Sequence, residues 1–286
     1  MAAKPRIAIV GAGNLGAALA VSLWRAGYAI EAVITHSRGA SLTKARKLAK
    51  EVGARALAGM PVDIAAEVIW FCVPDAEIAH AAHTLAATLQ WKGRVAFHSS
   101  GALTSDELSS LRKRGAVVAS VHPLMTFVRR SRPSLAGVPF AIEGEAAAVR
   151  VARRIVKDLG GHAYPIRKAD KAAYHAWGTF ASPLFTALLA TTEQVAVAAG
   201  VTRKAAQRRM IPILLQTLAN YASFDAAGAF SGPIVRGDVD TVKRHLRVLR
   251  KVPAASEVYL SLAQAAVRYL PGKNKAELLK TLRSPR

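Results

Sequence analysis

A short apolar strand, a glycine-rich turn and an amphipathic helix follow one another at the start of the chain. The strand is predicted at Ile7–Val10, and three glycines follow it in the spacing G-x-G-x-x-G. In this pattern the first glycine makes a tight turn, the second lets backbone approach a pyrophosphate, and the third allows close helix packing. The helix N-terminus adds free N–H groups and a positive dipole. The sequence therefore predicts a dinucleotide site whose first contacts are Gly11, Gly13, Asn14, Leu15 and Gly16.

Apolar runs rich in Val and Ile continue an alternation of strand and helix through the first half of the chain. After the first strand they lie at Ala29–Thr35, Val68–Val73, Val95–His98 and Val117–Val121. The segments "GVPFAIEG", "EAAAVRVARRIVKDLG" and "HAYPI" then predict a strand, a helix and a short last strand. This alternation is typical of the α/β class, with a doubly wound parallel Rossmann sheet. We assign the Rossmann NADP-binding domain to residues 1–166.

Strand signals stop after Ile166, and residues 167–286 predict an all-helical domain for substrate binding and dimerisation. Helices are expected at 169–199, 202–222, 238–250, 254–270 and 274–283, with Thr202, Asp238 and Asn274 as N-caps. The segment "FDAAGAFSGPIVRGD" is expected to be a long connection. On the first helix, one stripe of apolar side chains is expected to be core: Ala173, Trp177, Phe180, Leu184 and Leu188.

Composition limits the classes of protein that this chain can represent. Its only cysteine, Cys72, lies in an apolar run, so a disulfide framework is excluded and a cytoplasmic location is expected. We expect neither a signal peptide nor a membrane span, and we predict no metal site. The net charge of +22 would suit a nucleic-acid partner. However, the basic residues are spread over nearly every predicted helix, so a small-molecule substrate is the expected partner, with a homodimer possible.

The end of the second strand decides between NAD and NADP. A carboxylate there binds the free ribose hydroxyls of NAD, whereas Arg and small polar groups suit the extra phosphate of NADP. The chain reads "VITHSRGASLTKAR", and Ser37 and Arg38 are placed to bind a 2′-phosphate, with Ser41 and Lys44 as helpers. We therefore expect NADPH as the cofactor. The alternative is that this segment is a solvated basic loop.

Polar side chains follow the later strands, where ligands of a doubly wound sheet collect. Val73 and Pro74 are expected beside the cofactor, and Asp75 is expected to cap the next helix. Two histidines and two hydroxyls are expected to converge near the nicotinamide. We assign Ser99 to cofactor binding, Ser100 to catalysis, and His98 and His122 to substrate binding.

The first helix of the second domain carries a second set of candidates. Lys171, His175, Gly178 and Ser182 share one face at helical spacing. A lysine one turn before a histidine can donate a proton to a carbonyl oxygen while hydride reaches the carbon, and the histidine can orient it. Lys171 and His175 are therefore predicted catalytic residues, with Ser182 at the substrate. The alternative is an exposed lysine beside a structural histidine.

The order of these motifs resembles a known superfamily. A Rossmann domain followed by a helical domain whose first helix bears Lys171 and a polar partner is similar to the β-hydroxyacid dehydrogenase, phosphogluconate dehydrogenase and ketopantoate reductase superfamily, where the partner is typically Asn. More closely, "HSSGAL", "HPLMTF", "DKAAYHAW" and "GPIVRGDVDTVKRHL" resemble Rossmann-like proteins with an appended C-terminal domain of unknown function. The resemblance covers nearly the whole chain and implies an NADP-linked oxidoreductase.

The predicted reaction is reduction of a small carbonyl acid, such as a 2-keto acid resembling ketopantoate. Arg236, just before a predicted helix N-terminus, is expected to hold the carboxylate. Many relatives carry Asn at the position of Pro183, so the substrate pocket of this chain is expected to differ from theirs. Two alternatives stay open: an imine reductase similar to pyrroline-carboxylate reductases, and a non-catalytic protein that binds NADPH as a sensor or structural ligand.

Overall fold

A computed structural model describes residues 3–36, 39–59, 61, 63–129 and 131–283 of the chain. Contacts divide the chain into two compact units, Met1–Thr179 and Phe180–Arg286. The first unit extends beyond the predicted boundary at Ile166 because Lys171 and Tyr174, on the helix that follows, are buried in it.

In the described part of the first unit, eight strands form one sheet with the order β3-β2-β1-β4-β5-β6-β7-β8. Neighbouring strands are parallel except β6 and β7, which are antiparallel. The doubly wound α/β architecture is confirmed. The strands are β1 (Ile7–Val10), β2 (Ile30–Thr35), β3 (Arg55–Ala58), β4 (Val68–Phe71), β5 (Val95–His98), β6 (Val117–Pro123), β7 (Pro139–Gly144) and β8 (His162–Pro165).

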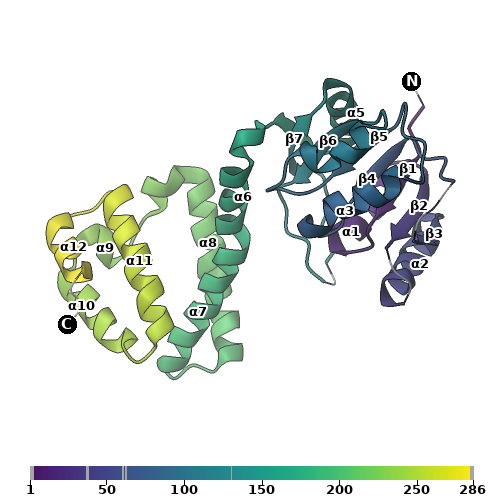
Figure 1. The fold of residues 1–286 in the computed structure, drawn as a ribbon. Helices are drawn as coiled ribbons and strands as arrows, with labels where there is room; N and C mark the ends of the chain where they lie inside the picture. The colour runs from purple at the N-terminus through teal and green to yellow at the C-terminus, as the bar shows by residue number, and fades with distance from the viewer. Residues whose placement is uncertain (1–2, 37–38, 60, 62, 130, 284–286) are drawn as a thin grey trace. The chain divides into compact units, whose positions relative to one another are not determined.

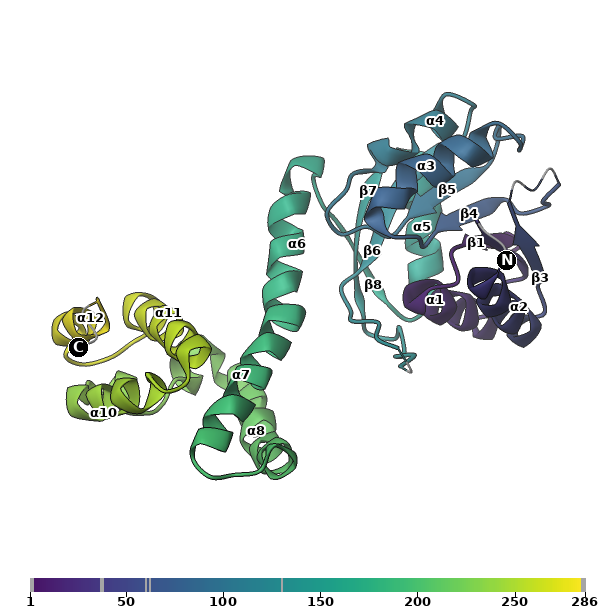
Figure 2. The ribbon, with the colours of Figure 1, turned by 60° about the horizontal axis from the view of Figure 1, so that its bottom comes forward.

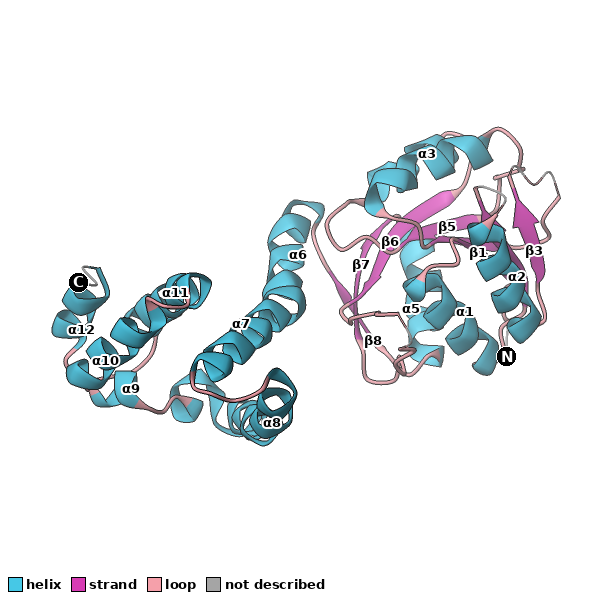
Figure 3. Cartoon of the chain, turned by 90° about the horizontal axis from the view of Figure 1, so that it is seen from below, coloured by secondary structure: helices cyan, strands magenta, loops and turns pink. Residues whose placement is uncertain are grey.

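Helices cover both faces of this sheet, which explains why its central strands are apolar throughout (Figure 1). One core lies under α1, α2 and α5, and a second lies under α3 on the opposite face (Figure 3). Leu111 of α4 belongs to this second core. The helices are α1 (Asn14–Arg25), α2 (Ala40–Val52), α3 (Asp75–Ala86), α4 (Ser109–Arg112) and α5 (Ala146–Asp158), and α6 (Lys171–Thr179) ends the unit.

The register of the parallel strands aligns their carboxyl ends. Val10 pairs with Phe71, Phe71 with His98, and His98 with Ser120. The glycine turn after β1, the loop after β5 and the end of β6 therefore lie along one edge of the sheet, where ligands of such sheets bind.

The second unit contains helices in its described residues, as predicted, and their order is a π-helical segment (Phe180–Leu184), α7 (Phe185–Ala198), α8 (Arg203–Ala229), α9 (Pro233–Arg236), α10 (Val239–Leu249), α11 (Pro253–Tyr269) and α12 (Lys275–Arg283). Helices α10, α11 and α12 lie side by side around an apolar core (Figure 2). The Thr202 and Asp238 side chains accept from backbone N–H groups as N-caps.

Two details of the predicted helices are wrong. The helix expected over 169–199 is π-helical at Phe180–Leu184, which includes Pro183, a residue without a backbone N–H. The expected connection after residue 222 is partly helical, because α8 resumes after a kink at Asp225, where the backbone is not helical (φ 65°, ψ −173°), and ends at Ala229, and α9 follows.

The apolar stripe expected to be core is exposed except at Leu188, which is half-buried. The exposed fractions are 57% for Trp177, 72% for Phe180 and 46% for Leu184. In α8 only Ala206 is buried, and most of the large apolar side chains that follow it along the helix are exposed. Helical periodicity therefore identified the apolar face of this helix correctly, but it could not show whether other residues of the chain cover that face.

No helix among the described residues is both long enough and apolar enough to span a bilayer.

Candidate functional site

The glycine turn has the close packing that a dinucleotide site requires. Gly11 has φ of +105°, a conformation that favours glycine, and a Cβ there would lie 2.6 Å from the Cys72 carbonyl oxygen. A Cβ on Gly16 would lie 2.0 Å from the Gly11 carbonyl oxygen, whereas nothing described lies within 4 Å of a Cβ on Gly13. The second glycine therefore leaves backbone open to a ligand, and no described side chain caps the N-terminus of α1.

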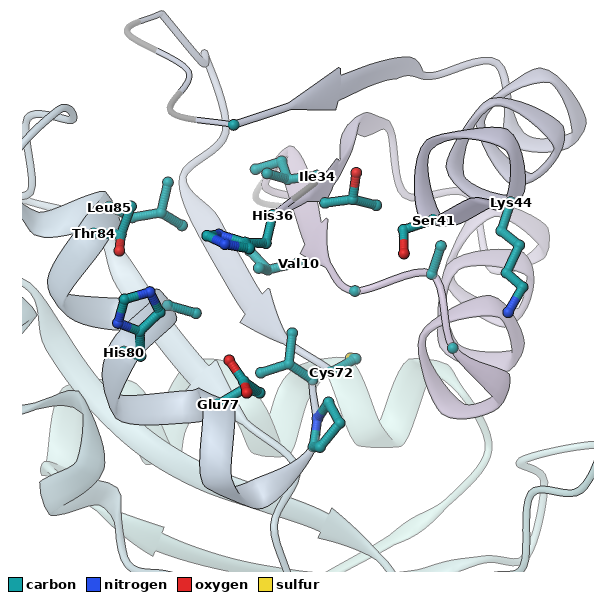
Figure 4. Close-up of a pocket in the computed structure, with 18 residues that line it drawn as sticks. Val10, Ile34, His36, Ser41, Lys44, Cys72, Glu77, His80, Thr84 and Leu85 are labelled. Atoms are coloured by element: carbon teal, nitrogen blue, oxygen red, sulfur yellow. The ribbon is translucent and has the colours of Figure 1, made fainter. Parts of the chain in front are cut away.

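A cavity of about 420 Å³ lies against this turn (Figure 4). Gly11 and Gly13 line it together with Val73 and Pro74, two residues predicted to contact the cofactor. Figure 4 shows Ser41 and Lys44 on one side of the cavity and His80 and Thr84 on the other. Its described lining residues are Val10, Gly11, Ala12, Gly13, Ile34, Thr35, His36, Ser41, Lys44, Gly59, Cys72, Val73, Pro74, Glu77, His80, Ala81, Thr84 and Leu85.

Sequence reasoning missed the two histidines of this cavity. The His36 and His80 rings meet edge to face with centroids 5.7 Å apart. His36 directly follows β2, so its position at the sheet edge was a usable signal. His80 lies on α3, and its approach to His36 depends on how that helix packs.

Two residues of the predicted cofactor set make contacts away from the cavity. The Asn14 side-chain amide donates to the Phe127 carbonyl over 3.2 Å. Leu15 is half-buried and packs against the core beneath α1. Ser37 and Arg38, the predicted 2′-phosphate ligands, lie outside the described residues.

The loop after β5 is held by its own serines. The Ser99 hydroxyl accepts from the Trp70 indole N–H over 2.8 Å, inside the core. The Ser100 hydroxyl donates to Asp75 Oδ2 over 2.7 Å and accepts from the backbone N–H groups of Ala102 and Leu103. Asp75 was predicted to be the N-cap of α3. It is instead the first residue of this helix, and Pro74 occupies the N-cap position. Because its neighbour Pro74 lines the cavity, Asp75 connects this loop to the wall of the cavity.

His98 is buried and neutral in this loop. Its Nδ1 accepts from the Ser100 backbone N–H over 3.1 Å, so the proton is on Nε2, which donates to the Thr104 carbonyl over 2.9 Å. Burial, the largest cause, lowers the pKa of His98 to about 4, and the nearby Lys171 ammonium lowers it further. His98 therefore braces the loop through both ring nitrogens.

Lys171 is the buried charge of the cluster, with 1% of its surface exposed. Its Nζ donates to the Ser120 hydroxyl over 2.6 Å and to the Ser100 carbonyl over 3.0 Å. Burial lowers its pKa to about 8, against the opposing effect of the Glu143 and Asp75 carboxylates. Glu143 is itself buried and accepts from the Ser105 backbone N–H and hydroxyl. Lys171 thus connects β6, the loop after β5 and α6.

The side chains of His122 and His175 both lie next to Gly101, which has no side chain of its own. A Cβ on Gly101 would lie 2.9 Å from both His122 Nε2 and His175 Cδ2. His122 is half-buried and His175 is exposed. The first unit therefore brings together five predicted residues: His98, Ser100, His122, Lys171 and His175.

Both halves of the chain match models of known protein domains. Residues 1–123 match the model of a Rossmann-like domain, and residues 138–266 match a domain of unknown function (DUF2520). The chain is a Rossmann-like protein with a DUF2520 domain. This agrees with the resemblance drawn from its motifs. A search of curated proteins gave no match.

Solved structures share the fold of this DUF2520 protein along nearly its whole length. A provisionally assigned NADP oxidoreductase from Bacteroides fragilis has a TM-score of 0.76 at 21% identity, over 92% of this chain and 97% of that one. An imine reductase from Myxococcus stipitatus in complex with NADP+ has a TM-score of 0.65 at 18% identity, over 98% and 100%. A pyrroline-5-carboxylate reductase from Coxiella burnetii has a TM-score of 0.57 at 15% identity, over 96% and 99%.

Two predicted substrate residues of the DUF2520 protein belong to the second unit. Ser182 is half-buried in the π-helical segment, and Arg236 is the exposed last residue of α9. Their roles at a substrate stay predictions.

The lowered pKa values of His98 and His122 predict that the stability of the protein depends on pH. The pKa of both His98 and His122 is about 4 in the folded protein and 6.5 in a free histidine, so the unfolded chain binds more protons between these values. The free energy of unfolding is therefore expected to be fully present above about pH 6.5 and to fall as pH drops toward 4, by up to about 3 kcal/mol per histidine. Urea titrations at pH 5 and 7 would measure this fall.

Tryptophan fluorescence suits these titrations because all four tryptophans lie in the first unit. His122→Gln should shrink the stability difference between pH 7 and pH 5. His162→Gln, at an exposed histidine of β8, is the control and should leave that difference unchanged. Equal differences in all three proteins would contradict the prediction.

Proposed function

We propose that this protein is an NADPH-dependent oxidoreductase that reduces the carbonyl group of a small acid. One observation carries the proposal: a cavity at the glycine turn adjoins, through the consecutive residues Pro74 and Asp75, a buried lysine and histidine cluster on the same sheet edge. The NADP and NADPH complexes among proteins of the same fold support it.

The residues of the cavity fit a phosphorylated dinucleotide. The open position at Gly13 and the uncapped N-terminus of α1 suit a pyrophosphate. Lys44 and Ser41 offer a charge and a hydroxyl to a 2′-phosphate, and among the described lining residues Glu77, on α3, is the only carboxylate. When bound, NADPH supplies the hydride.

The cluster can stabilise the negative charge that develops on the carbonyl oxygen when a hydride adds to the carbonyl carbon. Direct proton donation by Lys171, the role predicted from the sequence, requires that a substrate reach an ammonium with 1% of its surface exposed. We therefore assign to Lys171 a fixed positive charge that also holds the loop at Ser100. The exposed His175 orients the substrate and supplies the proton.

Imine reduction is the second candidate. It is favoured by the imine reductases, the reductive aminase and the pyrroline-carboxylate reductases among the proteins of the same fold. Absorbance of NADPH across a panel of keto acids, amino-ketone pairs and cyclic imines would separate the candidates. Tight NADPH binding with no turnover in the panel would favour a non-catalytic protein and overturn both.

We expect NADPH to bind at least about tenfold more tightly than NADH, because a charge-assisted contact to phosphate is worth about 1.5–3 kcal/mol. Fluorescence titration measures both dissociation constants. Lys44→Ala should reduce this preference, whereas Lys47→Ala, an exposed lysine of the same helix that does not line the cavity, should preserve it. Equal affinity for the two cofactors would overturn the NADPH assignment.

We also propose a homodimer, because α8 carries large exposed apolar side chains that water solvates poorly: Ile211, Ile213, Leu215, Leu218, Tyr221 and Phe224. Light scattering after size exclusion should give twice the mass of the chain. Leu218→Glu should give the monomer mass, and Gln207→Glu, at an exposed polar residue of α8, should not. A monomeric wild-type protein would overturn this proposal.

A further inference from the structure

His122 and Tyr174 form a polar pair beside Lys171 to which the proposed reaction assigns no joint role. The Tyr174 hydroxyl lies 2.7 Å from His122 Nδ1, and the two rings meet edge to face at 87° with centroids 5.4 Å apart. Tyr174 is 7% exposed. The Tyr164 and Trp177 rings contact it edge to face at 6.5 and 6.0 Å. This packing fixes the Tyr174 ring with its hydroxyl at the imidazole.

The opposite nitrogen of His122 points toward the loop after β5. Gly101 has no side chain, and a Cβ there would collide with Nε2 at 2.9 Å. His122 is half-buried at the sheet edge where the cluster lies, so solvent reaches part of this residue. One nitrogen is therefore held by Tyr174, and the other lies at the loop where a substrate is expected.

The surroundings of His122 favour its neutral form. Burial is the largest cause that lowers its pKa, to about 4, and the nearby Lys171 ammonium, with the neighbouring His175 and His98 side chains, lowers it further. Burial, the largest cause, and the neighbouring Tyr164 hydroxyl raise the pKa of the Tyr174 hydroxyl, which therefore keeps its proton. In a neutral imidazole one nitrogen carries the proton and the other accepts a hydrogen bond.

We propose that Tyr174 donates to His122 Nδ1 and so holds His122 as the tautomer protonated on Nε2, which donates a hydrogen bond to the substrate carbonyl oxygen. His122 is then a catalytic residue and Tyr174 a positioning residue. A neutral imidazole can polarise a carbonyl in this way without transferring its proton. The role toward a substrate rests on the proposed reductase function, whereas the tautomer does not.

Nitrogen-15 NMR of the full-length protein at pH 7 tests the tautomer directly. His122→Gln identifies the His122 signals among those of the eight histidines. We expect the wild-type ring to be neutral and protonated on Nε2 alone. Tyr174→Phe keeps the ring packing but removes the hydroxyl, so we expect signals of the Nδ1-protonated form to appear. A charged His122, or one protonated on Nδ1, in the wild-type protein would overturn the proposal.

Turnover tests the second half of the proposal. Tyr174→Phe should lower kcat about tenfold and change KM and the NADPH dissociation constant less than about twofold. The matched control is Tyr259→Phe, because Tyr259 contacts His245 in the second unit with similar geometry, 3.1 Å and 90°. It should change neither kcat nor the His122 signals. Unchanged signals and kcat in Tyr174→Phe would overturn the proposal. The expected NMR result with no reduction of any substrate would instead overturn the reductase function.

Discussion

Lys171→Met is expected to lower turnover by about 100-fold or more while the protein melts at the same temperature or higher. Removal of one preorganised group that stabilises charge in the transition state typically costs about 10²–10³ in rate. Stability should not fall, because the pKa of Lys171 drops from 10.5 to about 8, which corresponds to about 3 kcal/mol spent on burying its charge. Methionine has a similar length and no charge. Steady-state rates and melting curves measure both effects.

The matched control for Lys171→Met is Lys168→Met. Lys168 lies three residues earlier and pairs with Asp106 at the surface, over 2.6 Å. Surface pairs of this kind contribute about 0–1 kcal/mol, so its rate should stay within about twofold of the wild type. NADPH affinity should be unchanged in both variants. Normal turnover in Lys171→Met would exclude the proposed role of the lysine.

Gly16→Ala is expected to prevent stable folding of the first unit. The new Cβ would lie 2.0 Å from the Gly11 carbonyl oxygen and 3.2 Å from the Cys72 Cβ, so α1 could keep its place only if the turn opened. Overpacking in a core typically costs about 1–3 kcal/mol, and a backbone clash of this size should cost at least that much. Urea denaturation followed by tryptophan fluorescence measures the loss.

Gly13→Ala separates folding from binding. Nothing described lies within 4 Å of its Cβ, and its φ of −73° suits alanine, so the variant should fold as the wild type does. The added methyl group would occupy the approach of a pyrophosphate, so NADPH affinity should fall at least about tenfold. Unchanged affinity in this variant would mean that the cofactor does not lie on the turn.

The strongly patterned parts of the fold could be predicted from the sequence. Buried parallel strands are continuous apolar runs, and β1 and β5 begin and end where predicted. The strand β3 was missed because Arg55–Ala58 is a short edge strand with an exposed arginine and no β-branched residue. Local sequence cannot show that such a segment pairs with β2.

The candidate site was predicted only as a set of residues. Strand ends identified His98, Ser100 and His122 because their place on the sheet edge follows from topology. The burial of Lys171 could not be predicted, since a lysine at the start of a helix is usually solvated. It depends on Ser120 of β6 and on the loop after β5, which only the tertiary structure brings to the ammonium.

The single cysteine of the chain lies where the cofactor turn meets the sheet. Cys72 is 8% exposed, its carbonyl oxygen contacts the Gly11 position, and burial raises the pKa of its thiol. A thiol reagent needs both access and the thiolate, so the closed turn protects this sulfur. Because the chain has no other cysteine, the rate of alkylation measures how often the segment after β4 separates from the glycine turn. A ligand that holds the two together would slow the reaction.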